Sequence, residues 1–104
     1  IIGYRSGVAL GTGTSTEISG VMVGGAVTGF AIGQGAFVHL VGNTVEKSSG
    51  TGISLEPGAR GSAEKNAIRC AHGHCVCYGG DCTGRSNYVF GNGAFRMTDT
   101  DCDD

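Results

Sequence analysis

The residues best suited to chemistry lie in one short segment, Cys70-Ala71-His72-Gly73-His74-Cys75-Val76-Cys77, with Cys82 close behind it. Thiolate and imidazole groups are the ligands that zinc prefers in proteins. A closed zinc site usually takes its ligands in two pairs, each separated by about two to four residues, and this segment does not show that spacing. Buried thiols, disulfide bonds, and zinc or iron at the Cys/His cluster are therefore the three interpretations.

His72 and His74 form a separate candidate metal site. In an extended segment the two side chains project to the same side. In a trimer, three such pairs could converge on the symmetry axis and bind one metal ion. The alternative is a pair of solvated loop histidines.

These residues belong to a chain that repeats itself. A four-residue pattern returns with first positions 22, 23 and 22 residues apart, as Gly7-Val8-Ala9-Leu10, Gly29-Phe30-Ala31-Ile32, Gly52-Ile53-Ser54-Leu55 and His74-Cys75-Val76-Cys77. A fixed period of this size indicates a solenoid, in which each repeat is one coil stacked on its neighbours. A β-sandwich also uses short strands, but it does not produce this matched recurrence.

Alternation along each short strand predicts which side chains point inward. The expected inward positions form two ladders, Val8, Phe30, Ile53 and Cys75, and Leu10, Ile32, Leu55 and Cys77. The expected outward row is Ala9, Ala31, Ser54 and Val76. A second repeated element, built on a Gly-Asn corner, predicts a ladder of stacked amides at Asn43, Asn66 and Asn92.

The spacing of two other cysteines makes them the best disulfide candidate. Cys82 and Cys102 are 20 residues apart, which is close to one coil. Stacked positions on adjacent coils are ~4.8 Å apart, within the range of Cα separations that a disulfide accepts. The chain has 5 cysteines, so at least one stays unpaired.

The coils that begin at Gly24 and Val41 and the following Gly50–Leu55 segment resemble coils of right-handed parallel β-helix proteins. That group includes pectate-lyase-like enzymes, phage tailspikes and extracellular adhesins. The resemblance implies an all-β fold of about four coils with a period of about 22 residues. It implies no particular activity, because lyases, hydrolases, epimerases and inert stalks share this coil.

Residues 1–104 are expected to form a single β-helical domain. The chain opens Ile1-Ile2-Gly3, without a Met or a charged region, and we expect a segment or processed piece of a longer chain. No capping element is visible at either end of the repeats. Both coil ends are therefore expected to expose strand edges and core side chains.

Composition excludes some classes of partner. Charged residues make up 15% of the chain, its net charge is −2, and its basic residues are scattered, so nucleic-acid binding is not indicated. No apolar run reaches the ~20 residues of a membrane span. The glutamates are scattered as well, and the acidic run 99–104 is expected to be a solvated tail.

Two hypotheses for function follow. The first is a structural protein, a β-helical segment of a virion spike, fibre or extracellular surface appendage. It associates with copies of itself, with a trimer favoured by resemblance to spike stalks, and surface polysaccharide is a further partner. The alternative is a fragment of a carbohydrate-active β-helix enzyme, a polysaccharide lyase or hydrolase. No catalytic residue is assigned, and an extracellular or virion location is expected.

Overall fold

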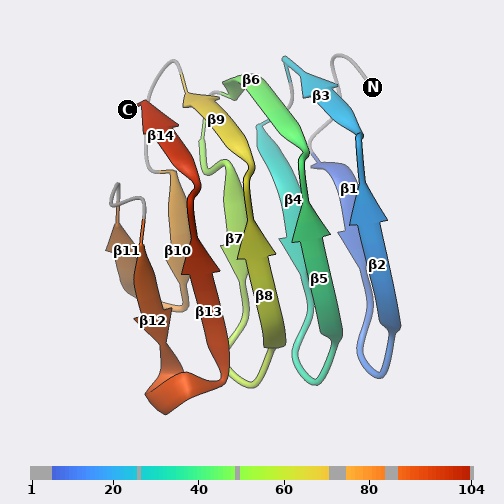
Figure 1. Cartoon of the computed structure of the whole chain (residues 1–104). Coiled ribbons are helices and arrows are strands. Elements are labelled where there is room, and N and C mark those ends of the chain that lie inside the picture. The colour runs from blue at the N-terminus through green and yellow to red at the C-terminus, as the bar shows by residue number, and fades with distance from the viewer. Residues whose placement is uncertain (1–5, 26, 49, 71–74, 84–86, 104) are drawn as a thin grey trace.

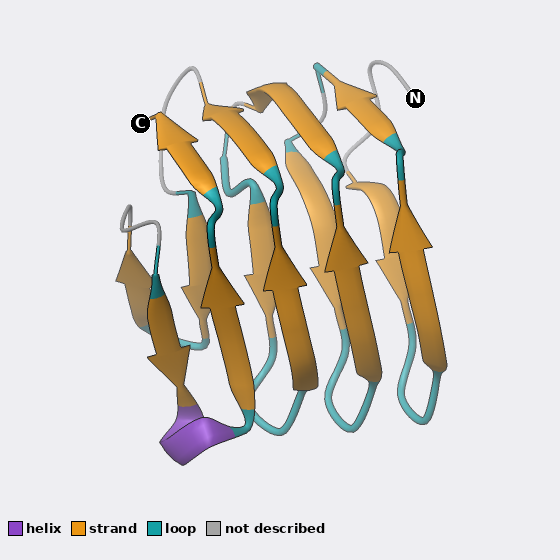
Figure 2. Cartoon of the chain, viewed as in Figure 1, coloured by secondary structure: helices purple, strands orange, loops and turns teal. Residues whose placement is uncertain are grey.

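The chain winds into a right-handed parallel β-helix, as the repeat predicts. The structure, a computed structural model, describes residues 6–25, 27–48, 50–70, 75–83 and 87–103. From the N-terminal to the C-terminal side, the chain rises along the front of the molecule, crosses backward at the top and descends behind (Figure 1). Almost all of its regular structure is strand, as the colours of Figure 2 show.

Three sheets form the walls of the solenoid, and each takes one parallel strand from each coil, while the last coil adds a second, antiparallel strand to two of them. Sheet 1 has the order β1 (Ser6–Leu10), β4 (Thr28–Ile32), β7 (Ile53–Leu55), β10 (Val76–Tyr78) and β11 (Asp81–Thr83). Sheet 2 has the order β2 (Ser15–Ser19), β5 (Phe37–Val41), β8 (Arg60–Glu64), β13 (Phe95–Thr98) and β12 (Tyr88–Phe90). Sheet 3 has the order β3 (Met22–Gly24), β6 (Thr44–Ser48), β9 (Ala67–Cys70) and β14 (Asp101–Asp103).

The predicted inward ladders are confirmed in the first three coils. Val8 lies opposite Phe30, and Phe30 lies opposite Ile53, in parallel register. Phe30 and Ile53 are fully buried. Equivalent inward positions of sheets 2 and 3, such as Leu40 and Val45, complete the same core.

The fourth coil is shifted by one residue from the predicted alignment. Val76, and not Cys75, lies opposite Ile53, and Cys77 lies opposite Ser54. Val76 is therefore buried, and Cys77 joins the outward row of Ala9, Ala31 and Ser54. The prediction failed here because the segment offers two alternative sets of inward positions, Cys75 with Cys77 or Val76 with Tyr78. Both sets consist of residues that are compatible with burial.

An amide ladder lies at the corner between sheets 2 and 3, as predicted for its first two members. Asn43 and Asn66 are buried, and the Asn66 Oδ1 atom accepts hydrogen bonds from the backbone N–H and the side-chain amide of Asn43, at 2.9 and 3.2 Å. Asn43 in turn accepts a hydrogen bond from the Val21 N–H at 3.0 Å. The third predicted member is wrong, because Asn92 lies in the exposed 3₁₀ turn η1 (Gly91–Gly93) and Thr100 is the buried residue at the fourth corner.

The C-terminal end of the solenoid is closed, contrary to the expectation of two open ends. Strand β11 runs antiparallel to β10, and β12 runs antiparallel to β13, so two of the three sheets finish with a reversed strand (Figure 1). An aromatic cluster of Tyr78, Tyr88, Phe90 and Phe95 packs beneath these strands, with ring centroids 4.7 to 6.4 Å apart. At the other end, Val8, Leu10 and Ile18 of the first coil are only partly buried, whereas Val23 on β3 is fully buried.

Candidate functional site

The structure gives the cysteines a different arrangement from the predicted one. Cys77 and Cys82 face each other on the antiparallel pair β10 and β11 and form a disulfide, with their Cα atoms 4.0 Å apart. Cys82 is therefore not bonded to Cys102, whose backbone pairs with Ile68 in sheet 3. The predicted coil-to-coil disulfide is corrected to a bond within the closing hairpin, and Cys77 is not a reduced thiol.

Cys75 is buried, as expected. Its thiol lies 4.0 Å from the Ile68 carbonyl oxygen, in the core and away from solvent. The candidate metal pair, His72 and His74, lies outside the described residues. Within the described ranges, no group of three or more His, Cys, Asp or Glu side chains could hold a metal ion.

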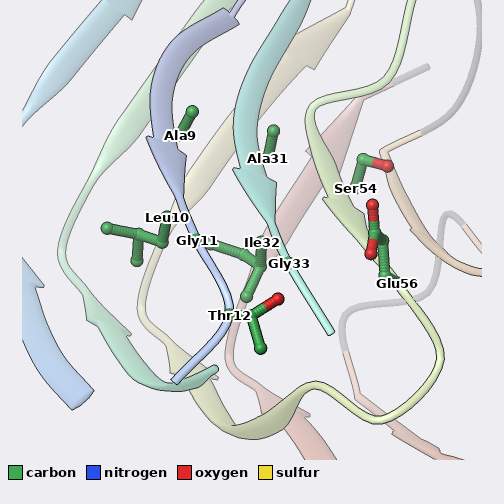
Figure 3. A pocket seen from close by; sticks show the side chains of 9 residues that line it. All are labelled: Ala9, Leu10, Gly11, Thr12, Ala31, Ile32, Gly33, Ser54 and Glu56. Carbon is green, nitrogen blue, oxygen red and sulfur yellow. The ribbon is translucent and has the colours of Figure 1, made fainter. Parts of the chain in front are cut away.

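A hollow of about 330 Å³ lies on the outward face of sheet 1 (Figure 3). Small side chains form its floor at Ala9, Ala31 and Ser54, and Thr12 and Glu56 border it. The Glu56 carboxylate accepts a hydrogen bond from the Gln34 N–H at 3.1 Å, which fixes the carboxylate beside the turn that leads to sheet 2. The hollow is thus a small-residue surface with one charged group at its rim.

A polar row crosses the outward face of sheet 2. Its members occupy one register position on four adjacent strands, and they are Glu17, His39, Ser62 and Arg96. The His39 Nδ1 and Ser62 Oγ atoms are 2.7 Å apart, so the imidazole and the hydroxyl share a hydrogen bond whose direction depends on the tautomer. This bond holds the His39 ring in one orientation.

Two further side chains extend the polar row into a patch. The Phe37 ring, 44% exposed, meets the His39 ring edge to face, with centroids 5.2 Å apart. Arg60 lies opposite Phe37 on the next strand and is exposed. We call Phe37, His39, Arg60, Ser62 and Arg96 the sheet 2 patch.

Gly61 sets the backbone between the two β8 members of this patch. Its φ angle is +125°, a backbone conformation that residues other than glycine rarely adopt. A Cβ atom built there would collide with the Val38 carbonyl oxygen. Only glycine lets β8 approach β5 this closely, and Arg60 and Ser62 on either side of it both reach the outward face.

The glutamates remain apart, as expected from their spacing, but the expectation that they lie mostly in loops is wrong, because three of the four are in strands. Glu17 and Glu64 lie on β2 and β8 of sheet 2, Glu46 lies on β6 of sheet 3, and Glu56 lies in a turn. The acidic run, expected to be a solvated tail, instead includes strand β14, where Asp101 forms an ion pair with Arg69 at 2.8 Å. No helix in the described part of the chain is long and apolar enough to cross a membrane.

Two of these features carry signals in the sequence that the repeat analysis missed. Tyr78-Gly79-Gly80-Asp81 has the two-residue glycine loop of a tight hairpin, and that hairpin brings Cys77 opposite Cys82. His39 and Ser62 are 23 residues apart, one coil period, which predicts neighbouring positions on adjacent strands. Comparisons with protein-family models, curated proteins and solved structures gave no match.

Proposed function

We propose that this chain is a structural segment that assembles laterally with copies of itself in an extracellular or virion appendage. The observation that carries the proposal is the outward face of sheet 1. Ala9, Ala31 and Ser54 hold one register position there on three adjacent coils. Side chains this small allow a second sheet to pack closely, at the ~10 Å that separates stacked sheets.

The hollow beside this row gives the face a shape that a partner can complement. It lies over the same strands, β1, β4 and β7, and is lined by Thr12 and Glu56 at the turn. A side chain from a neighbouring copy would fill it when the two faces meet. A closed trimer is the arrangement we propose, by resemblance to the stalks of phage spikes, and a closed symmetric assembly of this kind covers the face on every copy.

The closed C-terminal end favours lateral assembly over stacking from that end. Reversed strands β11 and β12 occupy the edges of sheets 1 and 2, where a further parallel coil would otherwise add. The Cys77–Cys82 disulfide supports an oxidising location, because disulfides persist outside the reducing cytosol.

Sedimentation velocity of the chain at micromolar concentration tests the proposal. The native chain should sediment as an oligomer, whereas Ala31→Arg should yield a folded monomer, because a long charged side chain prevents close approach of sheet 1. The matched control is Ala67→Arg, which places the same substitution at an outward position of β9 in sheet 3. A well-folded native monomer at high micromolar concentration contradicts the proposal, as does equal loss of assembly in both variants.

A further inference from the structure

We propose that the partner of the sheet 1 hollow is sheet 2 of a second copy, which inserts Phe37 into the hollow and pairs Arg60 with Glu56. This inference rests on the proposed lateral assembly and names the two faces that meet in it. The contact is head-to-tail, since each copy offers sheet 1 to one neighbour and the sheet 2 patch to the other. Such a contact closes into a ring when the rotation between copies completes a circle.

The hollow has no large side chain on its own face that could fill it in a neighbouring copy. Its floor is formed by Ala9, Ala31 and Ser54, and Glu56 lies at its rim (Figure 3). Two sheet 1 faces in contact would place one hollow against another and leave both of them unfilled. A large side chain from a different face of the molecule is therefore needed.

Phe37 has the size and the exposure for that role. Its side chain is 44% exposed on the outward face of β5, although aromatic rings gain from burial. The Phe37 ring contacts the His39 ring, with centroids 5.2 Å apart, and His39 is held in turn by its hydrogen bond to Ser62. A cavity of about 150 Å³ can hold benzene, so the hollow of about 330 Å³ accommodates this ring.

The two features lie at matching heights along the solenoid. Copies related by rotation about an axis parallel to the solenoid keep each coil at the same height. Phe37 begins β5 in the second coil, and Ala31 on β4 of that coil is the middle member of the floor. Arg60 begins β8 in the third coil, and Glu56 follows β7 in that coil. Both pairs flank turns that join sheet 1 to sheet 2, so one axis beside these turns aligns both contacts (Figure 1).

The charges at the third coil are complementary. The Glu56 carboxylate is positioned at the rim by the hydrogen bond that it accepts from the Gln34 N–H, at 3.1 Å. Arg60 is exposed and forms no ion pair with any residue that the structure describes. The glutamates of sheet 2 are remote from it, because Glu64 is at the other end of β8 and Glu17 is two strands away. A guanidinium that meets a carboxylate across an interface forms parallel hydrogen bonds and fixes the register between copies.

Charge reversal, followed by sedimentation velocity, tests the pairing. Glu56→Arg and Arg60→Glu, each alone, should weaken assembly at least about tenfold, because like charges then face each other at every contact. The double variant Glu56→Arg/Arg60→Glu should recover assembly to within about threefold of the native chain, because the pair forms again with its charges exchanged. The matched control is Glu64→Arg, at the other end of β8, which should leave assembly unchanged.

Phe37→Ser tests the insertion independently of charge. It should weaken assembly at least about tenfold, because the aromatic side chain that fills the hollow is lost. The matched control is Met22→Ser, at a side chain that is 61% exposed on β3 of sheet 3, and this variant should assemble as the native chain does. Thermal melts establish that each variant is folded.

The outcomes separate this inference from the proposed function. A native chain that stays monomeric overturns both. An oligomer that Ala31→Arg disperses, but that the charge reversals and Phe37→Ser leave intact, overturns only the pairing of sheet 1 with sheet 2 and indicates contact between two sheet 1 faces. A double variant that assembles no better than the single variants likewise overturns the pairing.

Discussion

The two ends of this solenoid are built differently, although the same coil lies between them. At the first coil, Val8, Leu10 and Ile18 face the interior but remain partly exposed. At the last coil, Phe90 and Phe95 are fully buried beneath reversed strands. A parallel coil covers the core of the coil before it but leaves its own core side chains uncovered. At the C-terminal end of the solenoid, antiparallel strands and large aromatic side chains cover the core of the last coil.

The hydrogen bonds of the tyrosines show how the closed end is attached to the coils below it. The Tyr78 hydroxyl accepts a hydrogen bond from the Gly58 N–H at 2.8 Å and lies 3.3 Å from the Ala59 carbonyl, both in the turn of the preceding coil. Tyr88 reaches Asp81 on β11 at 3.3 Å, which ties the two reversed strands together. The first coil is tied through Asn43, whose side chain accepts a hydrogen bond from the Val21 N–H and donates one to the Ile18 carbonyl oxygen.

The largest expected effect is at the closed end. Phe90→Ala should lower the free energy of unfolding by about 3–5 kcal/mol, because it leaves a cavity among three other aromatic rings. Leu10→Ala, at the partly exposed first coil, should cost less than about 2 kcal/mol, since the surrounding space is already open to water. Urea unfolding of both variants measures the difference, and equal costs would show that the two ends are equally closed.

A smaller effect is expected at the amide ladder that anchors the first coil. Asn43→Ala leaves the Val21 N–H and the Ile18 carbonyl without their side-chain partner, at about 1–3 kcal/mol for each buried group. Both groups are only partly buried, so we expect a total near 2–3 kcal/mol. Hydrogen exchange should show faster exchange at Val21.

The matched control for the ladder is Asn92→Gly. Asn92 is exposed and its φ angle of 56° suits glycine, so this change should leave stability within about 0.5 kcal/mol of the native value. A cost equal to that of Asn43→Ala would contradict the assignment of the ladder to the corner of sheets 2 and 3.

The smallest of the three effects is expected from the disulfide. Replacing Cys77 and Cys82 together by Ser should cost about 2 kcal/mol, because the bond closes a loop of only 5 residues in the unfolded chain. Amide exchange should rise in β10 and β11 and stay unchanged in β1 and β2. Ser54→Ala, in the same outward row as Cys77, is the control, and a uniform rise across the chain would show that the bond is not local to the closed end.

The coil period was predictable because glycine, small and aliphatic residues recur at fixed positions over three repeats. The register of the last repeat was harder to predict, because Cys75 and Val76 are equally suited to burial opposite Ile53. Only the hairpin at Gly79 decides which of the two residues takes that position. Asp99 and Thr100 replace the Gly-Asn corner without resembling it in sequence, and they share its left-handed backbone, with φ 48° at Asp99, and its burial, at Thr100. The sheet 2 patch depends on neighbours across strands, so it needed the register before it could be recognised.

The separation between repeating coils and closing strands has a consequence for how such a chain can vary in length. Register is passed from one coil to the next at an interval of 22 residues from β1 to β4 and of 23 residues from β4 to β7 and from β5 to β8. Duplicating one such unit ahead of β10 would lengthen the rod by one strand spacing, ~4.8 Å, while the closing hairpin and its disulfide stayed intact. Evolution can thus change the length of this rod in whole coils without redesigning its end.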